Sequence, residues 1–184
     1  MYRLQKLVWA ARALAWAPLF GKLSMPSYLG PPLFLVRTRN IFVGRRVRIF
    51  PGLRAETHHG GKIFIGDNVS IGQHFHITAM GDLKIGAGTL IVGSVMVTDI
   101  DHDYSDITRP VHEQKFIYSR TEIGPNCFLG TGARIQAGTI LGEGCIVGAN
   151  SVVRGEYPAH SVIVGAPARI VKRYDFKNAA WKRC

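Results

Sequence analysis

The chain has 184 residues, which is enough for one compact domain and leaves little room for two. Apolar residues make up 47% of it and charged residues 19%, so the composition is that of a globular protein rather than a disordered one. The formal net charge of +11 favours anionic partners such as phosphates or anionic lipid. No RNA-binding aromatic motif, zinc-ligand spacing or recognition helix accompanies this charge, so nucleic acid is not the expected partner.

The N-terminal stretch MYRLQKLVWAARALAWAPLF is similar to a secretory signal, with early basic residues followed by an apolar run. Arg12 interrupts that run, however, and Pro18 directly follows the triplet Ala15-Trp16-Ala17 that is similar to a cleavage site. We therefore expect the segment to be retained. The uncharged part is also far shorter than the roughly 20 residues that a spanning helix requires.

The same stretch favours a helix that ends near Pro18 and Gly21. Two uses of its apolar side remain open. The stripe follows helical spacing, which is typical of packing on the protein's own body or on another subunit. Trp9, Trp16 and the nearby basic residues fit a helix that lies on an anionic membrane surface instead. The stripe consists of Leu4, Leu7, Val8, Ala11, Leu14 and Ala15.

From residue 40 the chain falls into hexads that begin with an aliphatic residue, often followed by glycine. The clearest run, residues 123–158, reads IGPNCF, LGTGAR, IQAGTI, LGEGCI, VGANSV, VRGEYP. This period predicts a parallel β-helix, in which three short strands and three turns make a coil of eighteen residues. The leading aliphatics point inward and stack at about 4.8 Å from coil to coil. The expected fold class is all-β, with a helical segment at 1–39, the β-helix at 40–173 and a tail at 174–184.

The chain has three cysteines, Cys127, Cys145 and Cys184, without a CxxC spacing. An odd number argues against a disulfide framework. Cys127 and Cys145 lie eighteen residues apart, at equivalent positions of successive coils, so we expect small buried side chains there.

The hexads, together with the closing stretch LGEGCIVGANSVVRGEYPAHSVIVGAPARIVKR, resemble the left-handed β-helix hexapeptide acyltransferases. The resemblance covers about residues 40–173. It is strongest to the bacterial polysaccharide O-acetyltransferases of the O-antigen, capsule and colanic-acid type, and extends to the maltose and galactoside acetyltransferases. It implies a left-handed coil, a homotrimer with active sites between neighbouring β-helices, and acetyl-CoA as the donor.

Between Val97 and Ile123 the hexads vanish, and the polar stretch VTDIDHDYSDITRPVHEQ takes their place. A long excursion from a rigid solenoid, expected at about residues 99–120, is where function tends to lie. Acyl transfer to a hydroxyl requires a base, for which histidine is suited. By the resemblance, TDIDHDY matches the family's catalytic histidine motif, which makes His102 the expected general base.

The acid that orients His102 is left open among Asp99, Asp101, Asp103 and Glu113. The resemblance favours Glu113, about a dozen residues downstream, and Asp101 is its rival close in sequence. For the acceptor we expect contacts from His74 in IGQHFHIT, from Asp99 and from His112. The Asp and His residues show no regular ligand spacing, so no metal site is expected.

The resemblance also implies a donor site. Thr131 and Ala149 match positions that contact the pantetheine arm, with Gly130 and Gly148 beside them giving room. The nucleotide phosphates call for basic groups, and Arg154 and Arg169 match the family's basic positions.

These features predict an acetyl-CoA-dependent sugar O-acetyltransferase of cell-surface polysaccharide or lipopolysaccharide biosynthesis. It would act in the cytoplasm or on the inner face of the cell membrane, on a sugar or a lipid-linked saccharide. Two alternatives remain open. One is acetylation of another small acceptor, such as an amino sugar, serine or an antibiotic; the other is a non-catalytic or carbonic-anhydrase-like β-helix.

Overall fold

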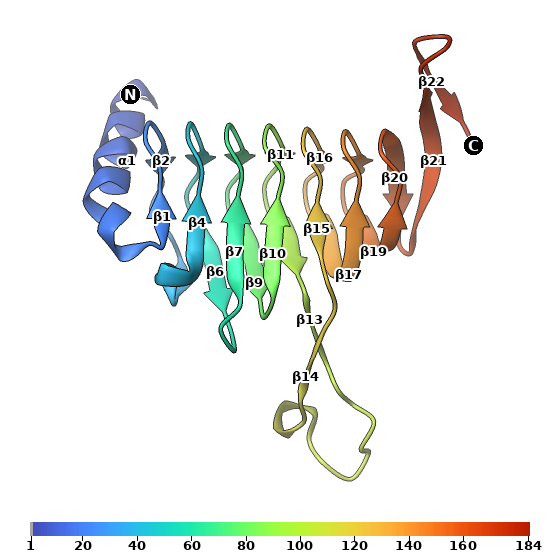
Figure 1. Ribbon diagram of the computed structural model, residues 1–184, viewed down its shortest axis with the longest axis horizontal. Helices are drawn as coiled ribbons and strands as arrows, with labels where there is room; N and C mark the ends of the chain where they lie inside the picture. The colour runs from blue at the N-terminus through green and yellow to red at the C-terminus, as the bar shows by residue number, and fades with distance from the viewer. Residues whose placement is uncertain (1) are drawn as a thin grey trace.

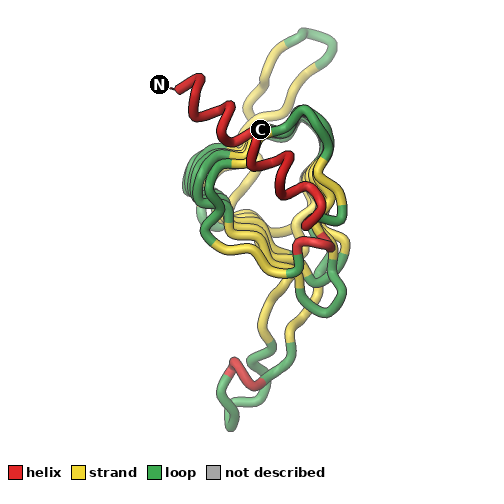
Figure 2. Tube along the Cα trace, turned by 90° about the vertical axis from the view of Figure 1, so that its left-hand side faces the viewer, coloured by secondary structure: helices red, strands yellow, loops and turns green. Residues whose placement is uncertain are grey.

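The computed structural model describes residues 2–184, with side chains from Leu4 onward. Its body is a parallel β-helix of stacked coils (Figure 1). One helix, α1 (Tyr2–Trp16), lies across the N-terminal end of the coil, and an antiparallel hairpin closes the other end (Figures 1 and 2). The predicted all-β parallel β-helix, with its short N-terminal helix and extruded loop, is confirmed.

Three faces of short parallel strands run along the coil. The first face contains β1 (Lys22–Leu23), β4 (Ile41–Val43), β7 (Lys62–Ile65), β10 (Asp82–Ile85), β15 (Glu122–Ile123) and the end of β17 (Arg134–Leu141). The second contains β2 (Tyr28–Leu29), β5 (Arg48–Ile49), β8 (Ser70–Ile71), β11 (Leu90–Ile91), β16 (Phe128–Leu129), β18 (Ile146–Val147) and β20 (Ser161–Gly165). The third contains β3 (Phe34–Val36), β6 (Arg54–Thr57), β9 (His76–Ala79), β12 (Met96–Thr98), the start of β17, and β19 (Val152–Tyr157). The closing hairpin is formed by β21 (Ala168–Asp175) and β22 (Ala180–Arg183).

The coils are not all eighteen residues long. Leu129 pairs with Val147, eighteen residues on, as the hexads predict. Ile71 pairs with Ile91 and Ile49 pairs with Ile71, so the earlier coils take twenty and twenty-two residues. The strands keep their alternation and every aligned aliphatic stays inside, because the extra residues sit in turns rather than in strands.

The first coil begins before residue 40, where the hexads were expected to start. β1, β2 and β3 pair in parallel with β4, β5 and β6 of the second coil. The 3-10 helices η1 (Ala17–Leu19) and η2 (Thr38–Asn40) connect this coil to α1 and to β4. The division of the chain at residues 39 and 173 stays a prediction.

The core is a column of aliphatic side chains. The leading residues of the hexads, such as Ile65, Ile85, Ile123 and Leu141, are buried on the first face, one above another. Cys127 and Cys145 are free and buried at successive coil corners, as expected, and their Sγ atoms donate to Gly142 and Pro158 carbonyls.

The excursion predicted at about 99–120 is a stalk that projects from the third face (Figure 1). Its base is a two-stranded antiparallel ribbon of β13 (Ile100–His102) and β14 (Phe116–Tyr118), in which His102 pairs with Phe116. The 3-10 helix η3 (Val111–Glu113) lies in its outer part. His102 is therefore on a regular strand, close to the body of the coil.

The helix α1 packs on the body through one side. Ala13 is buried in the core, and the ring of Trp9 lies 5.8 Å from the rings of both Tyr28 and Phe50. The predicted stripe faces away, with Leu7 67% exposed and Leu14 66% exposed. Packing of that stripe on the protein's own body is therefore wrong, because the tryptophans and Ala13 take that place. Along residues 2–184, no helix has the length and apolar character needed to cross a membrane.

Candidate active site

A groove of about 350 Å³ lies on the third face, at the base of the stalk. Its floor is formed by outward-facing side chains of three successive coils, and one wall is formed by the stalk. The lining residues are Arg54, Glu56, His58, His76, Thr78, Met96, Thr98, Ile100, His102 and Phe116. Residues up to 62 positions apart in the sequence, from Arg54 to Phe116, therefore meet in one concave site.

The alternation of β-strands explains the floor of the groove. In β6, Ala55 and Thr57 are buried, so Arg54 and Glu56 point outward. The parallel register then places Arg54 beside His76 and Glu56 beside Thr78, and places Met96 beside His76. A ladder of outward polar side chains follows directly from the pairing.

Glu56 is the central group of this floor. Its carboxylate is mostly buried and accepts from Arg54 Nε at 2.5 Å. Its oxygens lie 3.6 Å from His76 Nε2 and 4.0 Å from His58 Nε2. One carboxylate thus holds an arginine and lies close to two histidines, which gives the groove hydrogen-bonding groups in fixed positions.

The surroundings of His76 favour the neutral form of its imidazole. Burial lowers its pKa, and the charge of Arg54 lowers that pKa further, while Glu56 opposes both effects. Its Nε2 also lies 3.0 Å from the Thr78 hydroxyl. A neutral imidazole can both donate and accept a hydrogen bond, which suits recognition of a hydroxyl.

His102 stands at the edge of the groove on β13. Its side chain is exposed, and its ring packs edge-on to Phe116 at 5.0 Å between centroids. Within one chain, no carboxylate of the described residues bonds to this ring. The aromatic contact restricts the ring, and its nitrogens stay accessible to a substrate.

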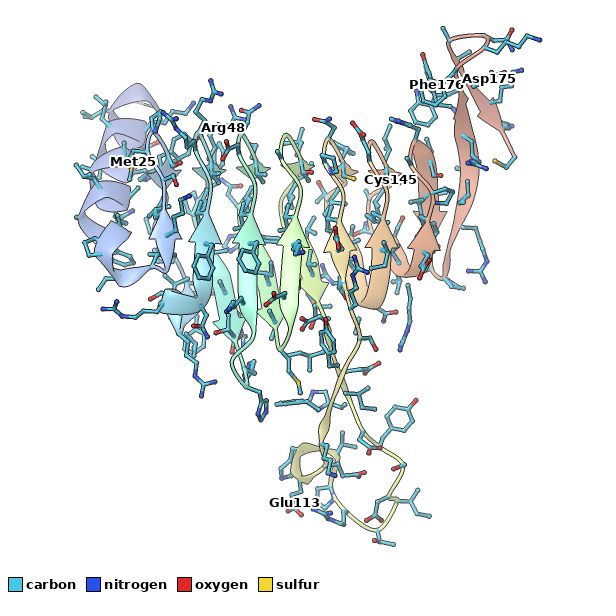
Figure 3. All side chains as sticks on the ribbon, viewed as in Figure 1. Met25, Arg48, Glu113, Cys145, Asp175 and Phe176 are labelled. Atoms are coloured by element: carbon cyan, nitrogen blue, oxygen red, sulfur yellow. The ribbon has the colours of Figure 1, made fainter. Side chains whose placement is uncertain are left out.

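The structure separates the two acids proposed to orient His102. Asp101 is the nearer one, because its Oδ1 accepts the His102 backbone N–H at 2.9 Å. Glu113 lies in η3 in the outer part of the stalk, where its Oε1 is 4.0 Å from His112 Nε2 (Figure 3). Glu113 does not line the groove. Of the two acids, only Asp101 touches the residue it was expected to orient, and it does so through the backbone.

Asp99, which we expected to bind acceptor, is fully buried. Its carboxylate accepts the backbone N–H groups of Met80 and Gly81 at 2.7 and 2.9 Å. Burial raises its pKa, although these hydrogen bonds oppose the shift. The arrangement ties the base of the stalk to the turn of the coil below.

The other two residues predicted to bind the acceptor, His74 and His112, lie outside the groove. His74 occupies a turn with φ of 55°, and a Cβ on Gly52 in the coil below would lie 2.6 Å from its Nδ1. His112 is in η3 with its side chain 82% exposed. His76, two residues from His74, lines the groove instead, because alternation turns it outward from β9.

The predicted donor residues gather at the corner between the second and third faces. Gly130 and Gly148 follow β16 and β18 in successive coils, and Thr131 and Ala149 beside them are exposed. A Cβ on Gly130 would lie 2.7 Å from the Ala149 nitrogen. Glycine at 130 is therefore required by coil stacking, whatever else it does.

The two predicted phosphate-binding arginines have different surroundings. Arg154 at the end of the third face reaches Asp101 Oδ2 at 3.1 Å through Nη1. Arg169 in β21 is exposed, and its Nη1 donates to the carbonyl of Ala168 at 2.8 Å. Of the two, Arg169 is not engaged by a carboxylate.

A larger cavity of about 600 Å³ lies on the first face, under the stacked rings of Phe42 and Phe64. Its described lining residues include the carboxylates Asp67 and Glu122 but no histidine. Three histidines, His58, His76 and His102, line the smaller groove instead. In the described part of the chain, no three His, Cys, Asp or Glu side chains are placed to hold a metal ion.

Arg54, Glu56, His58 and Phe116 were not predicted as site residues, and the acceptor contact was expected from His74 rather than from His76. Strand alternation in RAET and HIT was the available signal for the floor. The part played by Phe116 could not be read from the sequence, because it depends on how β14 pairs with β13.

Comparison with known proteins agrees with this architecture. The family model for bacterial transferase hexapeptide repeats (six repeats) matches residues 120–155. The chain is 34% identical over 159 residues to WbbJ of Escherichia coli K12, a protein provisionally named a lipopolysaccharide biosynthesis O-acetyl transferase; the match covers 83% of this chain and 81% of WbbJ.

Solved structures show the same fold. AntD, an N-acyltransferase from Bacillus cereus in complex with dTDP and 3-hydroxybutyryl-CoA, matches with a TM-score of 0.72 at 19% identity, over 91% of this chain and 90% of AntD. Galactoside acetyltransferase in complex with coenzyme A matches with a TM-score of 0.60 at 19% identity, over 94% and 84%.

The solved structures that share this solenoid are therefore an N-acyltransferase and an acetyltransferase. The protein belongs to the hexapeptide-repeat acetyltransferase family.

Proposed function

We propose that this protein transfers an acetyl group from acetyl-CoA to a sugar hydroxyl in the biosynthesis of a cell-surface polysaccharide or lipopolysaccharide. The observation that carries the proposal is the groove in which His102 lies beside a floor of Arg54, Glu56 and His76. Sugar hydroxyls are recognised by such charged and neutral hydrogen-bonding groups in fixed positions. The similarity to WbbJ supports the same class of acceptor.

In the proposed reaction an imidazole nitrogen of His102 removes the proton from the acceptor hydroxyl. The oxygen attacks the thioester carbonyl carbon, the new C–O bond forms and the C–S bond breaks. The proton held by His102 passes to the departing sulfur, so the products are the acetyl ester and free CoA thiol. A positioned base of this kind contributes roughly 10²- to 10⁴-fold to rate.

We further propose that the active enzyme is a homotrimer with the donor held between chains. Within one chain, Thr131 and Ala149 lie where the third face begins, whereas His102 lies beyond the end of that face. An extended donor along the corner of a neighbouring chain would bring its thioester to His102. Exposed apolar residues on the second face, such as Leu90 and Phe128, would be covered by such an assembly.

The test is release of CoA thiol from acetyl-CoA by the purified protein, measured with a panel of acceptors. The panel contains neutral hexoses, nucleotide-linked amino sugars, serine and a lipid-linked saccharide. We expect acceptor-dependent release with a sugar hydroxyl, and an O-acetyl ester identified by mass spectrometry. Transfer only to an amine would replace the proposal with the amino-sugar alternative, and absence of transfer to every acceptor would contradict it.

A further inference from the structure

The helix α1 is apolar on two opposite sides. At 100° per residue, Trp9, Ala13 and Trp16 share one side, and that side faces the body of the coil. Both described basic side chains of the helix also turn toward the body: Lys6 lies 5.9 Å from the Tyr28 ring centroid, and Arg12 Nη1 donates to the Leu29 carbonyl at 3.3 Å.

The opposite side carries an aliphatic stripe, and from Leu4 onward, where side chains are described, it holds no charged residue. Leu4, Leu7, Val8 and Leu14 are all at least 53% exposed, and Ala11 and Ala15 between them are exposed as well. Figures 1 and 2 show α1 at the extreme N-terminal end of the solenoid, with nothing beyond it. An apolar surface of this size on a described end of the molecule indicates an interaction site.

The charge of the protein is concentrated at the same end. The first 55 residues contain ten of the 23 basic residues and none of the 12 acidic ones, so almost all of the net charge of +11 arises there. Lys22, Arg39, Arg45 and Arg46 are exposed on and around the first coil, next to α1. The basic first coil therefore gives this end of the molecule a surface that favours an anionic partner.

We propose that α1 docks the protein onto an anionic lipid bilayer. The helix lies in the plane of the interface, with the stripe at the boundary of the acyl chains and the basic first coil against the phosphate headgroups. A second copy is a poorer occupant, because it would bring two positively charged ends together without an acid to offset them. The groove would then stand two to four coils, or about 10–20 Å, above the surface.

The test is flotation of the full chain with unilamellar vesicles of phosphatidylcholine, alone or mixed with phosphatidylglycerol. We expect binding to the mixed vesicles that weakens with salt, and little binding to phosphatidylcholine alone. Leu7→Ser combined with Leu14→Ser should weaken binding by about tenfold or more. Ile107→Ser, which removes a 96% exposed aliphatic from the stalk, is the matched control and should bind as the wild type does.

The charge is tested separately. Arg39→Gln combined with Arg46→Gln should weaken binding by about tenfold, whereas Lys115→Gln combined with Lys177→Gln should have little effect.

Equal binding of the stripe variant and the wild type would overturn the proposal. So would a change in oligomeric state of the stripe variant in sedimentation, since the stripe would then join copies of the chain. A single Leu4→Ser variant provides the same comparison if the double variant unfolds. None of these measurements uses turnover, so the outcome is independent of the proposed reaction.

Discussion

Arg154 Nη1 lies 3.1 Å from Asp101 Oδ2, and this ion pair joins β19 to the first strand of the stalk. The sequence suggested separate tasks for these residues, phosphate binding for Arg154 and orientation of His102 for Asp101. Because the other oxygen of Asp101 accepts the His102 backbone N–H, the pair links a coil above the stalk to the candidate base.

Arg154→Gln and Asp101→Asn should each lower kcat by displacing His102, and the double variant should be little worse than either, because both remove one interaction. Thermal unfolding should change little, since exposed ion pairs contribute below about 1 kcal/mol. Fully additive losses in a double-mutant cycle would show that the two residues act independently, for instance with Arg154 on a donor phosphate.

His102→Ala should lower kcat by roughly 10²- to 10⁴-fold in the thiol-release assay, with an unchanged circular dichroism spectrum. His112→Ala is the matched control, because it removes a histidine from the same stalk outside the groove. An active His102→Ala variant would remove the proposed mechanism.

The pKa of His76 should lie below the ordinary histidine value of about 6.5 when followed by NMR titration. Arg54→Gln should raise this pKa and Glu56→Gln should lower it, because the two neighbours act with opposite signs. A lowered folded-state pKa means that the unfolded chain binds more protons in this range. The contribution of His76 to stability is therefore present above pH 6.5 and is lost as pH falls through the folded-state pKa. A titration above 6.5 would contradict the assignment.

Asp99→Ala should destabilise the fold by about 1–3 kcal/mol in urea denaturation, because it leaves the N–H groups of Met80 and Gly81 without an acceptor. Asp99→Asn keeps one acceptor oxygen and should cost less. Asp103→Ala, on the same stalk, removes an acceptor only from the backbone N–H of Ser105 and should barely change the midpoint of urea denaturation. Equal stability of the Asp99→Ala variant would show that the turn does not depend on this carboxylate.

Ala149→Trp should raise the KM for acetyl-CoA at least tenfold if the donor arm lies along the corner beside Thr131, because the side chain would fill that path. Ala87→Trp places the same bulk at an exposed corner between the first and second faces and should leave KM unchanged. Equal KM values in the two variants would move the donor site elsewhere.

The hexads by themselves determined the β-helix, because each leading aliphatic has no place except the interior and each coil can pair only with its neighbours. The interruption by VTDIDHDYSDITRPVHEQ likewise determined where the chain leaves the solenoid. In both cases the local sequence pattern was enough for the prediction, because the hexad repeat and its interruption can be read from contiguous residues.

Only the tertiary structure decided which side chains meet. Glu56, His76 and His102 come together because parallel register stacks β6, β9 and β12 and the β13–β14 pairing brings the stalk beside them. The helical spacing in α1 predicted an apolar stripe. The helix has a second apolar side, however, and only one of the two can pack against the β-helix. Trp9 packs against the Tyr28 ring and Ala13 is buried in the core at the end of the coil. Leu7 and Leu14 therefore face outward.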